Sequence, residues 1–330
     1  MARRLRRSVG IGALVVAVWA TASGCVTMPE ARTGRTVAWS PVTSERALTF
    51  LKRYEQVSNK ASETRDPELI AQVESGPLLR ATRAEFRIAN RLDPDRTSRS
   101  TRARYTNQRI YIPDLADYPV WFVAVSDLAD EGRTTVSLVV RSNAGSLWHM
   151  TQSVALDDDA QLPELVERNG KVVALDTGSN EGLVRSPWQA AQAYANLLMA
   201  GPDAPHAAAF HPHPQTARSH QATQRNKEQP GFTYDQKVSV VSVRALAVAD
   251  GSAFVLFTLE ENEELSLQDA RLRFDRNDAV AAYTGRAEGD SYLRTSWVWQ
   301  AVAVVPPKGA PDPRIRLLGV ERSLESAKMR

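Results

Sequence analysis

Residues 147–155, LWHMTQSVA, and residues 296–304, SWVWQAVAV, decide the fold of this 330-residue chain. Each stretch has a tryptophan at its second position and continues with residues that favour extended strands. A second pair is similar in the same way, with VWFVAV at residues 120–125 and AFVLFT at residues 253–258. The two pairs occur in the same order, so the sequence indicates that one arrangement of strands is present twice.

Further strand signals surround these stretches in both halves of the chain. In the first half, turn sequences at residues 130–132 and 142–145 separate successive strands, which is typical of an antiparallel meander. The predicted strands cover residues 105–112, 120–125, 134–141, 147–156 and 171–175 in the first half, and residues 233–248, 252–259, 292–305 and 314–320 in the second.

Helices are predicted ahead of the strands in each half. The starts carry N-capping side chains, and a proline at or near the first helical position strengthens several of them. In the second half, a serine, a proline and a glutamine together form a capping-box signal. The predicted helix starts are Ser44, Asp66 and residue 78 in the first half, and Ser186 and Asp203 in the second, where a polar stretch then runs to residue 226.

We therefore expect an α+β fold, built as a tandem repeat of two domains that each have helices first and an antiparallel sheet afterwards. The N-terminal domain is predicted at residues 42–178 and the C-terminal domain at residues 179–330. The alternative is a chance similarity between two α+β domains. Helices followed by a long-stranded antiparallel sheet resemble the cone-shaped NTF2-like domain, and this resemblance implies a cavity between a curved sheet and its helices.

Residues 1–24 precede the only cysteine, Cys25, and are typical of a secretory signal peptide. Four arginines are followed by a short apolar run at residues 11–20 and by the small residues ASG at 22–24. The apolar run is shorter than the roughly 20 residues that a membrane span needs. The end of this leader resembles the lipobox of bacterial lipoproteins, which implies a lipid on Cys25.

We expect Cys25 to hold the chain at the extracytoplasmic face of the cell membrane, because two acyl chains suffice for stable anchoring. Residues 25–41 are polar and aperiodic, and we interpret them as a flexible tether. Cleavage without lipidation and an uncleaved anchor are the alternatives. With its arginine-rich leader, its lipobox and a folded part of this size, the chain is similar to the uncharacterised secreted lipoproteins of actinomycetes.

The charge balance changes when the leader is removed. The four leader arginines belong to the 41 Lys and Arg of the chain, so 37 basic side chains remain against 38 acidic ones. A nearly neutral chain gives no electrostatic reason to expect nucleic acid as a partner. Because Cys25 is the only cysteine, we also expect no disulfide within the chain.

Four of the five histidines, His206, His211, His213 and His220, lie within 15 residues of one another. Imidazoles this close in sequence can share a zinc or copper ion. No Asp, Glu or Cys accompanies them at a standard ligand spacing, so the alternative is a polar surface segment with solvated or hydrogen-bonded histidines. These four residues are our only candidates for metal ligands, and we predict no metal site.

Other features of the sequence carry no chemical signature. Residues 157–159, DDD, and residues 260–264, EENEE, are interpreted as solvated acidic turns or loops. Trp297 and Trp299 are two residues apart on a strand and should share one face, either in the core or along a cavity. The sequence contains no familiar motif for a nucleophile, a phosphate, a zinc ion or a dinucleotide. We therefore predict no catalytic residue and no cofactor.

The sequence favours a non-catalytic module of the cell envelope that binds a small ligand or an envelope protein. An envelope enzyme, a hydrolase or isomerase with a polar pair in one cavity, is the alternative, and a purely structural surface module is a third possibility. Buried Asp, His or Tyr side chains that face one another would favour the enzyme. An apolar pocket lined by Trp and Phe would favour the binding module.

Overall fold

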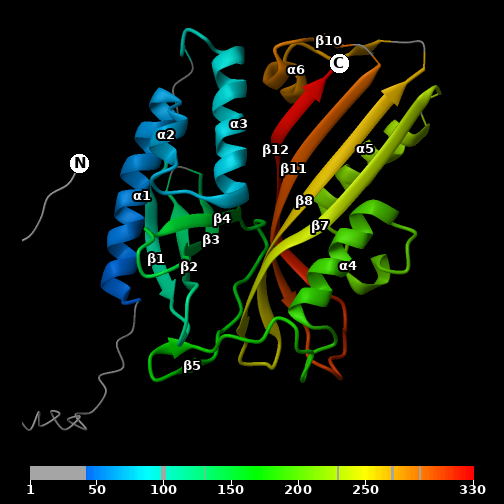
Figure 1. Ribbon diagram of the computed structural model, residues 1–330. Coiled ribbons are helices and arrows are strands. Elements are labelled where there is room, and N and C mark those ends of the chain that lie inside the picture. The colour runs from blue at the N-terminus through cyan, green and yellow to red at the C-terminus, as the bar shows by residue number, and fades with distance from the viewer. Residues whose placement is uncertain (1–41, 98–101, 130, 229, 269–270, 290) are drawn as a thin grey trace, which may run out of the picture. The chain divides into compact units, whose positions relative to one another are not determined.

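The computed structural model describes residues 42–97, 102–129, 131–228, 230–268, 271–289 and 291–330, which belong to one compact unit (Figure 1). The predicted signal peptide, Cys25 and the predicted tether at residues 25–41 lie outside the described residues. Within the described ranges, no helix combines the length and the apolar character that crossing a membrane requires.

The first half begins with three helices and continues with a four-stranded antiparallel sheet whose strands follow chain order. Thr43, one residue before the predicted cap, accepts a hydrogen bond from the Arg46 N–H and caps the first helix, and Asp66 caps the second. The helices are α1 Ser44–Thr64, α2 Pro67–Ile70 and α3 Gly76–Leu92, and the strands are β1 Tyr105–Tyr111, β2 Val120–Leu128, β3 Arg133–Arg141 and β4 His149–Ala155, followed by the short pair β5 Glu167–Arg168 and β6 Lys171–Val172.

The second half repeats the order of helices before strands, with longer strands. Ser186 and Gln189 form the predicted capping box at the start of its first helix. The helical elements are α4 Pro187–Ala200, η1 Ala207–Ala209 and α5 Pro214–Glu228, and the strands of the antiparallel sheet are β7 Phe232–Ala247, β8 Ala253–Leu267, β11 Tyr292–Val305 and β12 Arg316–Met329. Between β8 and β11 lie β9 Leu272–Arg273, α6 Ala279–Thr284 and β10 Glu288–Gly289.

Strand β2 shows how the first sheet is buried on both faces. Val120 and Phe122 belong to a core cluster with α1, α2 and α3, whereas Trp121 and Val123 belong to a different cluster. Successive side chains of a strand point to opposite faces, so two apolar faces need two covering layers. One layer is the helices of the first half, and the other is the second sheet.

Strand β8 is arranged in the same way in the second sheet. Val255 and Phe257 pack with α4, and Phe254 and Leu256 join Trp121 in the cluster between the sheets. The described chain is therefore layered as helices, sheet, sheet and helices. The predicted combination of helices with antiparallel sheets is confirmed, and the two sheets share one apolar layer.

The two sheets meet where the end of β4 lies against β12. The Asp157 N–H donates to the Leu318 carbonyl oxygen over 2.8 Å, and Gln152, on β4, donates to the Ala301 carbonyl oxygen over 2.9 Å. At Gly319 a side chain would collide with the Ala155 carbonyl oxygen, so glycine permits this approach. Residues on both sides of the predicted division at residue 178 build the shared apolar layer. The division into two domains therefore stays a prediction.

Parts of the sequence prediction are wrong. The stretch at residues 147–155 falls in the fourth strand of its sheet, whereas the stretch at residues 296–304 falls in the third strand of the other. Both stretches form strands with a buried face, and strands in similar surroundings favour similar residues. The two sequences can therefore resemble each other although they occupy different positions in their sheets. The polar stretch before residue 226 forms α5, whose four buried residues include Thr216 and His220. Its buried face is polar, so apolar spacing does not reveal it.

Candidate functional site

Three of the four candidate histidines line one pocket, but each has a partner of its own. The pocket, of about 330 Å³, lies beside α4, η1 and α5 and includes His211, His213 and His220. His213 Nε2 lies 2.8 Å from Asp157 Oδ2, and His211 Nε2 lies 3.2 Å from an Asp312 oxygen.

The helix histidine is bound within the protein in the same way. His220 Nε2 donates to the Leu197 carbonyl oxygen over 2.9 Å, and burial lowers the pKa of its imidazole. His206 does not line this pocket. Among the residues that the structure describes, no group of three or more His, Cys, Asp or Glu side chains is arranged to hold a metal ion.

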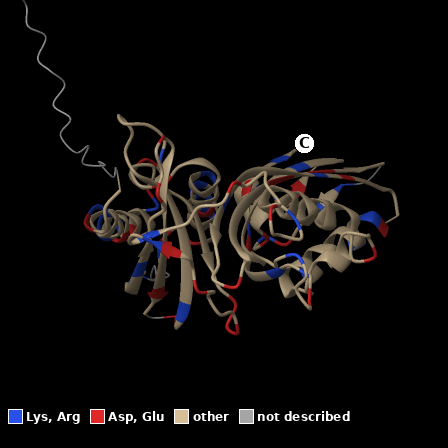
Figure 2. Ribbon diagram, turned by 90° about the horizontal axis from the view of Figure 1, so that it is seen from below, with Lys and Arg blue, Asp and Glu red and all other residues tan. Residues whose placement is uncertain are grey.

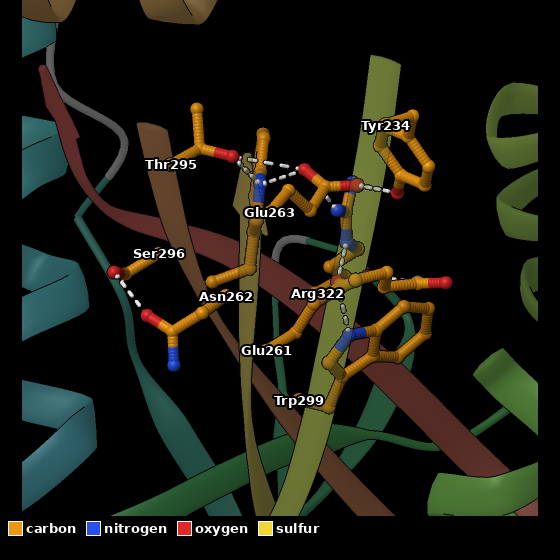
Figure 3. Close-up of polar contacts among 10 residues, drawn as sticks. Tyr234, Glu261, Asn262, Glu263, Thr295, Ser296, Trp299 and Arg322 are labelled. Atoms are coloured by element: carbon orange, nitrogen blue, oxygen red, sulfur yellow. Dashed lines mark hydrogen bonds and ion pairs between the residues drawn. The ribbon is translucent and has the colours of Figure 1, made fainter. Parts of the chain in front are cut away.

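The acidic run at residues 260–264 is not the predicted solvated loop, because it lies inside strand β8. Glu261 has no solvent-exposed surface. Its Oε2 accepts hydrogen bonds of 2.7 Å from the Trp299 indole N–H and from Arg322 Nε, and its Oε1 accepts one from the Gln236 amide (Figure 3). Every oxygen of this buried carboxylate therefore has a donor.

Glu263 lies two residues further along β8, on the same face, and is equally well paired. Its Oε1 accepts from the Tyr234 hydroxyl over 2.6 Å, and its Oε2 accepts from the Trp297 indole N–H over 2.7 Å. Arg322 Nη2 lies 3.1 Å from Oε2, and the guanidinium stands 3.9 Å from the centre of the Trp297 ring. One arginine thus bridges two glutamates on a single sheet face.

We assign this network, formed by Glu261, Glu263, Arg322 and their tryptophan and tyrosine donors, to structure. A buried charge is tolerated only when it is paired and hydrogen-bonded, and here both carboxylates are. Trp297 and Trp299 share one face as predicted, with Trp299 inside the core. Neither carboxylate has an oxygen free for a ligand.

The opposite face of the same strands borders a second polar site. In Figure 3, Ser296 and Asn262 point away from Glu261 and Glu263. Further along β11 and β12, the side chains of Gln300 and Glu321 reach a cavity of about 260 Å³. The rest of its wall comes from helices α1, α2 and α3, the turn between α2 and α3, strand β1 with the residues just before it, and strand β4. This acidic cavity therefore lies between the two halves of the chain.

Glu74 is the most deeply buried acid of the acidic cavity. It follows α2, where the backbone on either side of it bonds to Met150 at the start of β4, and only 3% of its surface is exposed. Its Oε1 accepts a 2.8 Å hydrogen bond from the Tyr54 hydroxyl. Its Oε2 is buried and has no hydrogen-bond partner among the described residues. A buried acceptor left unpaired is costly, so it marks a place where a ligand or water belongs.

Electrostatics in the acidic cavity disfavour negative charge. Burial raises the pKa of Glu74 to about 7, and the nearby Glu85 adds to this rise. The hydroxyls of Thr82 and Tyr54 act in the opposite direction, because they stabilise the charged carboxylate. The Thr82 hydroxyl lies near the carboxylate but makes no hydrogen bond to Oε2. Glu85 borders the cavity and remains exposed. The surrounding protein, and then the charge of Glu321, raise the pKa of its carboxyl group. Burial also raises the pKa of Glu321.

Sequence reasoning found only part of this site. Tyr54 is one of the residues that predict the apolar face of the first helix, and its ring does pack in the core. Glu74, Glu85 and Glu321 carry no local signal, because they are separated by up to about 250 residues and meet only in the fold. An acid that directly follows the apolar face of α2 is the one feature that singles out Glu74.

The structure thus defines a two-sheet protein with helices on both outer faces and an acidic cavity between its halves. Residues 40–328 match a domain of unknown function, DUF8094, and the chain belongs to this family. An uncharacterized lipoprotein of Streptomyces avermitilis is 25% identical over 314 residues, which cover 93% of this chain and 91% of that protein. An uncharacterized lipoprotein of Streptomyces coelicolor is 24% identical over 335 residues, which cover 99% and 96% of the two chains.

These relatives support the assignment of the chain to the lipoproteins. Both are named lipoproteins, and both are aligned over more than nine-tenths of their length. The predicted similarity to actinomycete lipoproteins is confirmed at this level.

Figure 2 shows acidic and basic segments interspersed over the helices and strands. The acidic cavity differs from this mixed distribution, because three glutamates border it and none of the described residues in its wall is basic.

Replacing Arg322 with methionine should strongly destabilise the protein. The change leaves Glu261 buried without its cation, which costs about 3–5 kcal/mol of the free energy of unfolding. Arg294→Met is the matched control, because Arg294 pairs with Glu264 in an exposed ion pair on the neighbouring strand and its loss should cost less than about 1 kcal/mol. Urea unfolding measures both, and equal losses would contradict the structural role of the network.

Glu74 should make stability depend on pH. Its pKa is about 7 in the folded protein against 4.5 for a free glutamate, so the folded state holds a proton that the unfolded state has released between these values. The free energy of unfolding therefore falls as the pH rises through this window, by about 3 kcal/mol at 1.36 kcal/mol per pKa unit.

Unfolding curves at pH values from 4 to 8 test this expectation. Glu74→Gln should remove the fall attributed to this residue, whereas Glu167→Gln, on the exposed strand β5, should retain it. Glu85 and Glu321 titrate in the same direction and stay in both variants. Parallel curves for the wild type and Glu74→Gln would show that the Glu74 pKa is not raised.

Proposed function

We propose that this protein is a lipid-anchored binding module of the cell envelope and that a small ligand occupies its acidic cavity. The observation that carries the proposal is the buried Oε2 of Glu74, which has no donor among the described residues and belongs to a residue that borders the cavity. The cavity volume of about 260 Å³ lies just below the roughly 300–1,000 Å³ typical of pockets for drug-sized ligands. A compact polar molecule matches both features.

We further propose that the anchor is a lipid on Cys25 after removal of residues 1–24, with residues 25–41 as a tether at the extracytoplasmic face. The position of the only cysteine and the names of both relatives support this arrangement. A tether would keep the cavity close to the membrane surface while leaving it open to the envelope.

A tandem origin of the two halves is part of the same proposal. In each half, helices precede four antiparallel strands that lie side by side in chain order. The equivalent strands would then be β1 with β7, β2 with β8, β3 with β11 and β4 with β12. The NTF2-like resemblance would apply to each half, with the difference that the two sheets pack against each other.

An envelope enzyme is the second candidate function, and one contact favours it. Tyr54 and Glu74 face one another in a buried pair, and a carboxyl group with a pKa near 7 suits general acid–base catalysis. Burial raises the pKa of Tyr54 well above its usual range, so its hydroxyl would orient Glu74 rather than release a proton. Binding requires only the cavity and its charge, and for that reason we place it first.

The anchor is tested by intact-mass analysis of the membrane fraction. We expect a mature chain that begins at a diacylated Cys25, and we expect Cys25→Ala to move the protein from the membrane to the medium. Stable attachment needs two acyl chains, and Cys25 is the residue that would carry them, so its replacement should release the protein from the membrane. An unlipidated chain cut elsewhere would refute both the anchor and the tether.

Ligand binding is tested on the full-length mature protein, extracted in mild detergent, with a panel of small cationic, neutral and anionic solutes. A solute present at 100 times its dissociation constant adds about 2.7 kcal/mol to the free energy of unfolding, which raises the thermal midpoint measurably. We expect at least one member to do so. Mass analysis of the solutes after incubation separates the two candidates, because an enzyme would convert the solute that it binds.

The cavity itself is tested by filling it. Ser62 is a half-buried residue of α1 that borders the cavity, so Ser62→Phe should abolish stabilisation by the solute, and Ser62→Ala should preserve it. A panel in which no solute raises the midpoint, or in which Ser62→Phe changes nothing, would refute the proposed function.

A further inference from the structure

The wall of the acidic cavity selects the charge of its ligand. Three glutamates, Glu74, Glu85 and Glu321, border it, and no Lys, Arg or His is among the described residues that do. The remaining polar groups are neutral hydroxyls and amides, and burial keeps the Tyr105 phenol neutral with a pKa of about 12. The charged side chains of this wall are all carboxylates among the described residues, and they would repel an anion.

The unpaired atom selects the kind of cation. Glu74 is more than nine-tenths buried, its Oε1 is already bound by the Tyr54 hydroxyl, and its Oε2 lacks a donor in the part of the chain that the structure describes. An N–H group that carries positive charge meets this requirement, because charge-assisted hydrogen bonds to carboxylates are the strong ones. A quaternary ammonium ion has the charge but no donor.

A metal ion matches the site less well than an organic cation. Ca²⁺ and Mg²⁺ need several oxygen ligands around one point. In the described part of the chain, no set of three acidic or histidine side chains converges in this way, and the glutamates of the cavity are spread over α3, β12 and the turn before α3. A molecule with extended length can contact separated carboxylates, whereas a single ion cannot.

From these contacts we infer that the acidic cavity binds a small organic ammonium ion, with an N–H group donating to Oε2 of Glu74 and with Glu85 and Glu321 balancing its charge. This inference rests on the proposed function and names the ligand class for that site. The Tyr54 and Tyr105 residues, whose ring centres are 6.2 Å apart, also border this cavity. Aromatic rings attract cations.

Putrescine is a suitable probe, because it is a linear diammonium ion of cavity size. Two molecules of matched length serve as controls, the neutral 1,4-butanediol and the anionic succinate. Titration calorimetry on the detergent-extracted protein at 0.15 M ionic strength limits binding by exposed acids. We expect heat of binding from putrescine alone.

Variants place the bound ion. Glu74→Gln keeps the shape of the side chain and removes its charge, and we expect it to weaken putrescine binding at least tenfold. Glu167→Gln changes the total charge equally, outside the cavity, and should bind as the wild type does. Glu85→Gln should weaken binding several-fold, and its open side chain keeps this variant informative if Glu74→Gln fails to fold.

The pH dependence gives an independent readout. The groups that face Glu74 are Tyr54 from α1, Thr82 and Glu85 from α3 and Tyr105 from β1, and none of them is a base. Because an ammonium ion binds the ionised carboxylate, putrescine affinity should rise about tenfold between pH 6 and pH 8. Glu74→Gln should remove most of this rise.

The outcomes separate the ligand class from the proposed function. Binding of 1,4-butanediol or succinate that Ser62→Phe abolishes, with no binding of putrescine, would overturn the ammonium ion and leave the binding module in place. Putrescine binding that Glu74→Gln and Ser62→Phe leave unchanged would place the ion elsewhere and overturn the inference. If no solute of the wider panel binds in the cavity, both are wrong.

Discussion

The contact between β4 and β12 is the constraint on which the rest of the structure depends. It joins the two sheets through a backbone hydrogen bond from Asp157 to Leu318, and Gly319 permits it because a larger residue would collide with the opposing strand. The shared apolar layer lies on one side of this junction. On the other side, α3 covers the second sheet, with Arg80 paired to Glu260 and Glu325. The acidic cavity lies between the shared apolar layer and the part of the second sheet that α3 covers.

Strand periodicity explains why two very different polar sites lie so close together. On β11 and β12, Trp299 and Arg322 face the helices of the second half, whereas Gln300 and Glu321 face the first half. Alternation of side chains separates the two sets without any further device. The buried network satisfies both of its carboxylates and stabilises a unique sheet. In the acidic cavity one carboxylate oxygen of Glu74 has no donor among the described residues, whereas both carboxylates of the network are paired.

Most elements of the fold could be predicted, and the exceptions have a common cause. The capping residues Asp66 and Ser186 and the alternating strands mark their elements locally. Residues 260–264 read as a solvated loop because five polar residues in a row normally face water. They form a strand instead, since Arg322 and Trp299, distant in sequence, supply the partners that Glu261 needs. Helix α5 escapes prediction for a related reason, because its buried residues are polar, and Thr216 and His220 among them bond to α4.

The sequence by itself determined most of the helices and antiparallel strands, their order and the similarity to lipoproteins, because caps, periodicity and a leader ending at Cys25 are local features. Only the tertiary structure decided that the two sheets share an apolar layer. It alone brought Glu74, Glu85 and Glu321 to one cavity and left an oxygen of Glu74 without a partner among the described residues. A pairing between residues some 250 positions apart depends on how layers pack, and no local pattern in the chain encodes that distance.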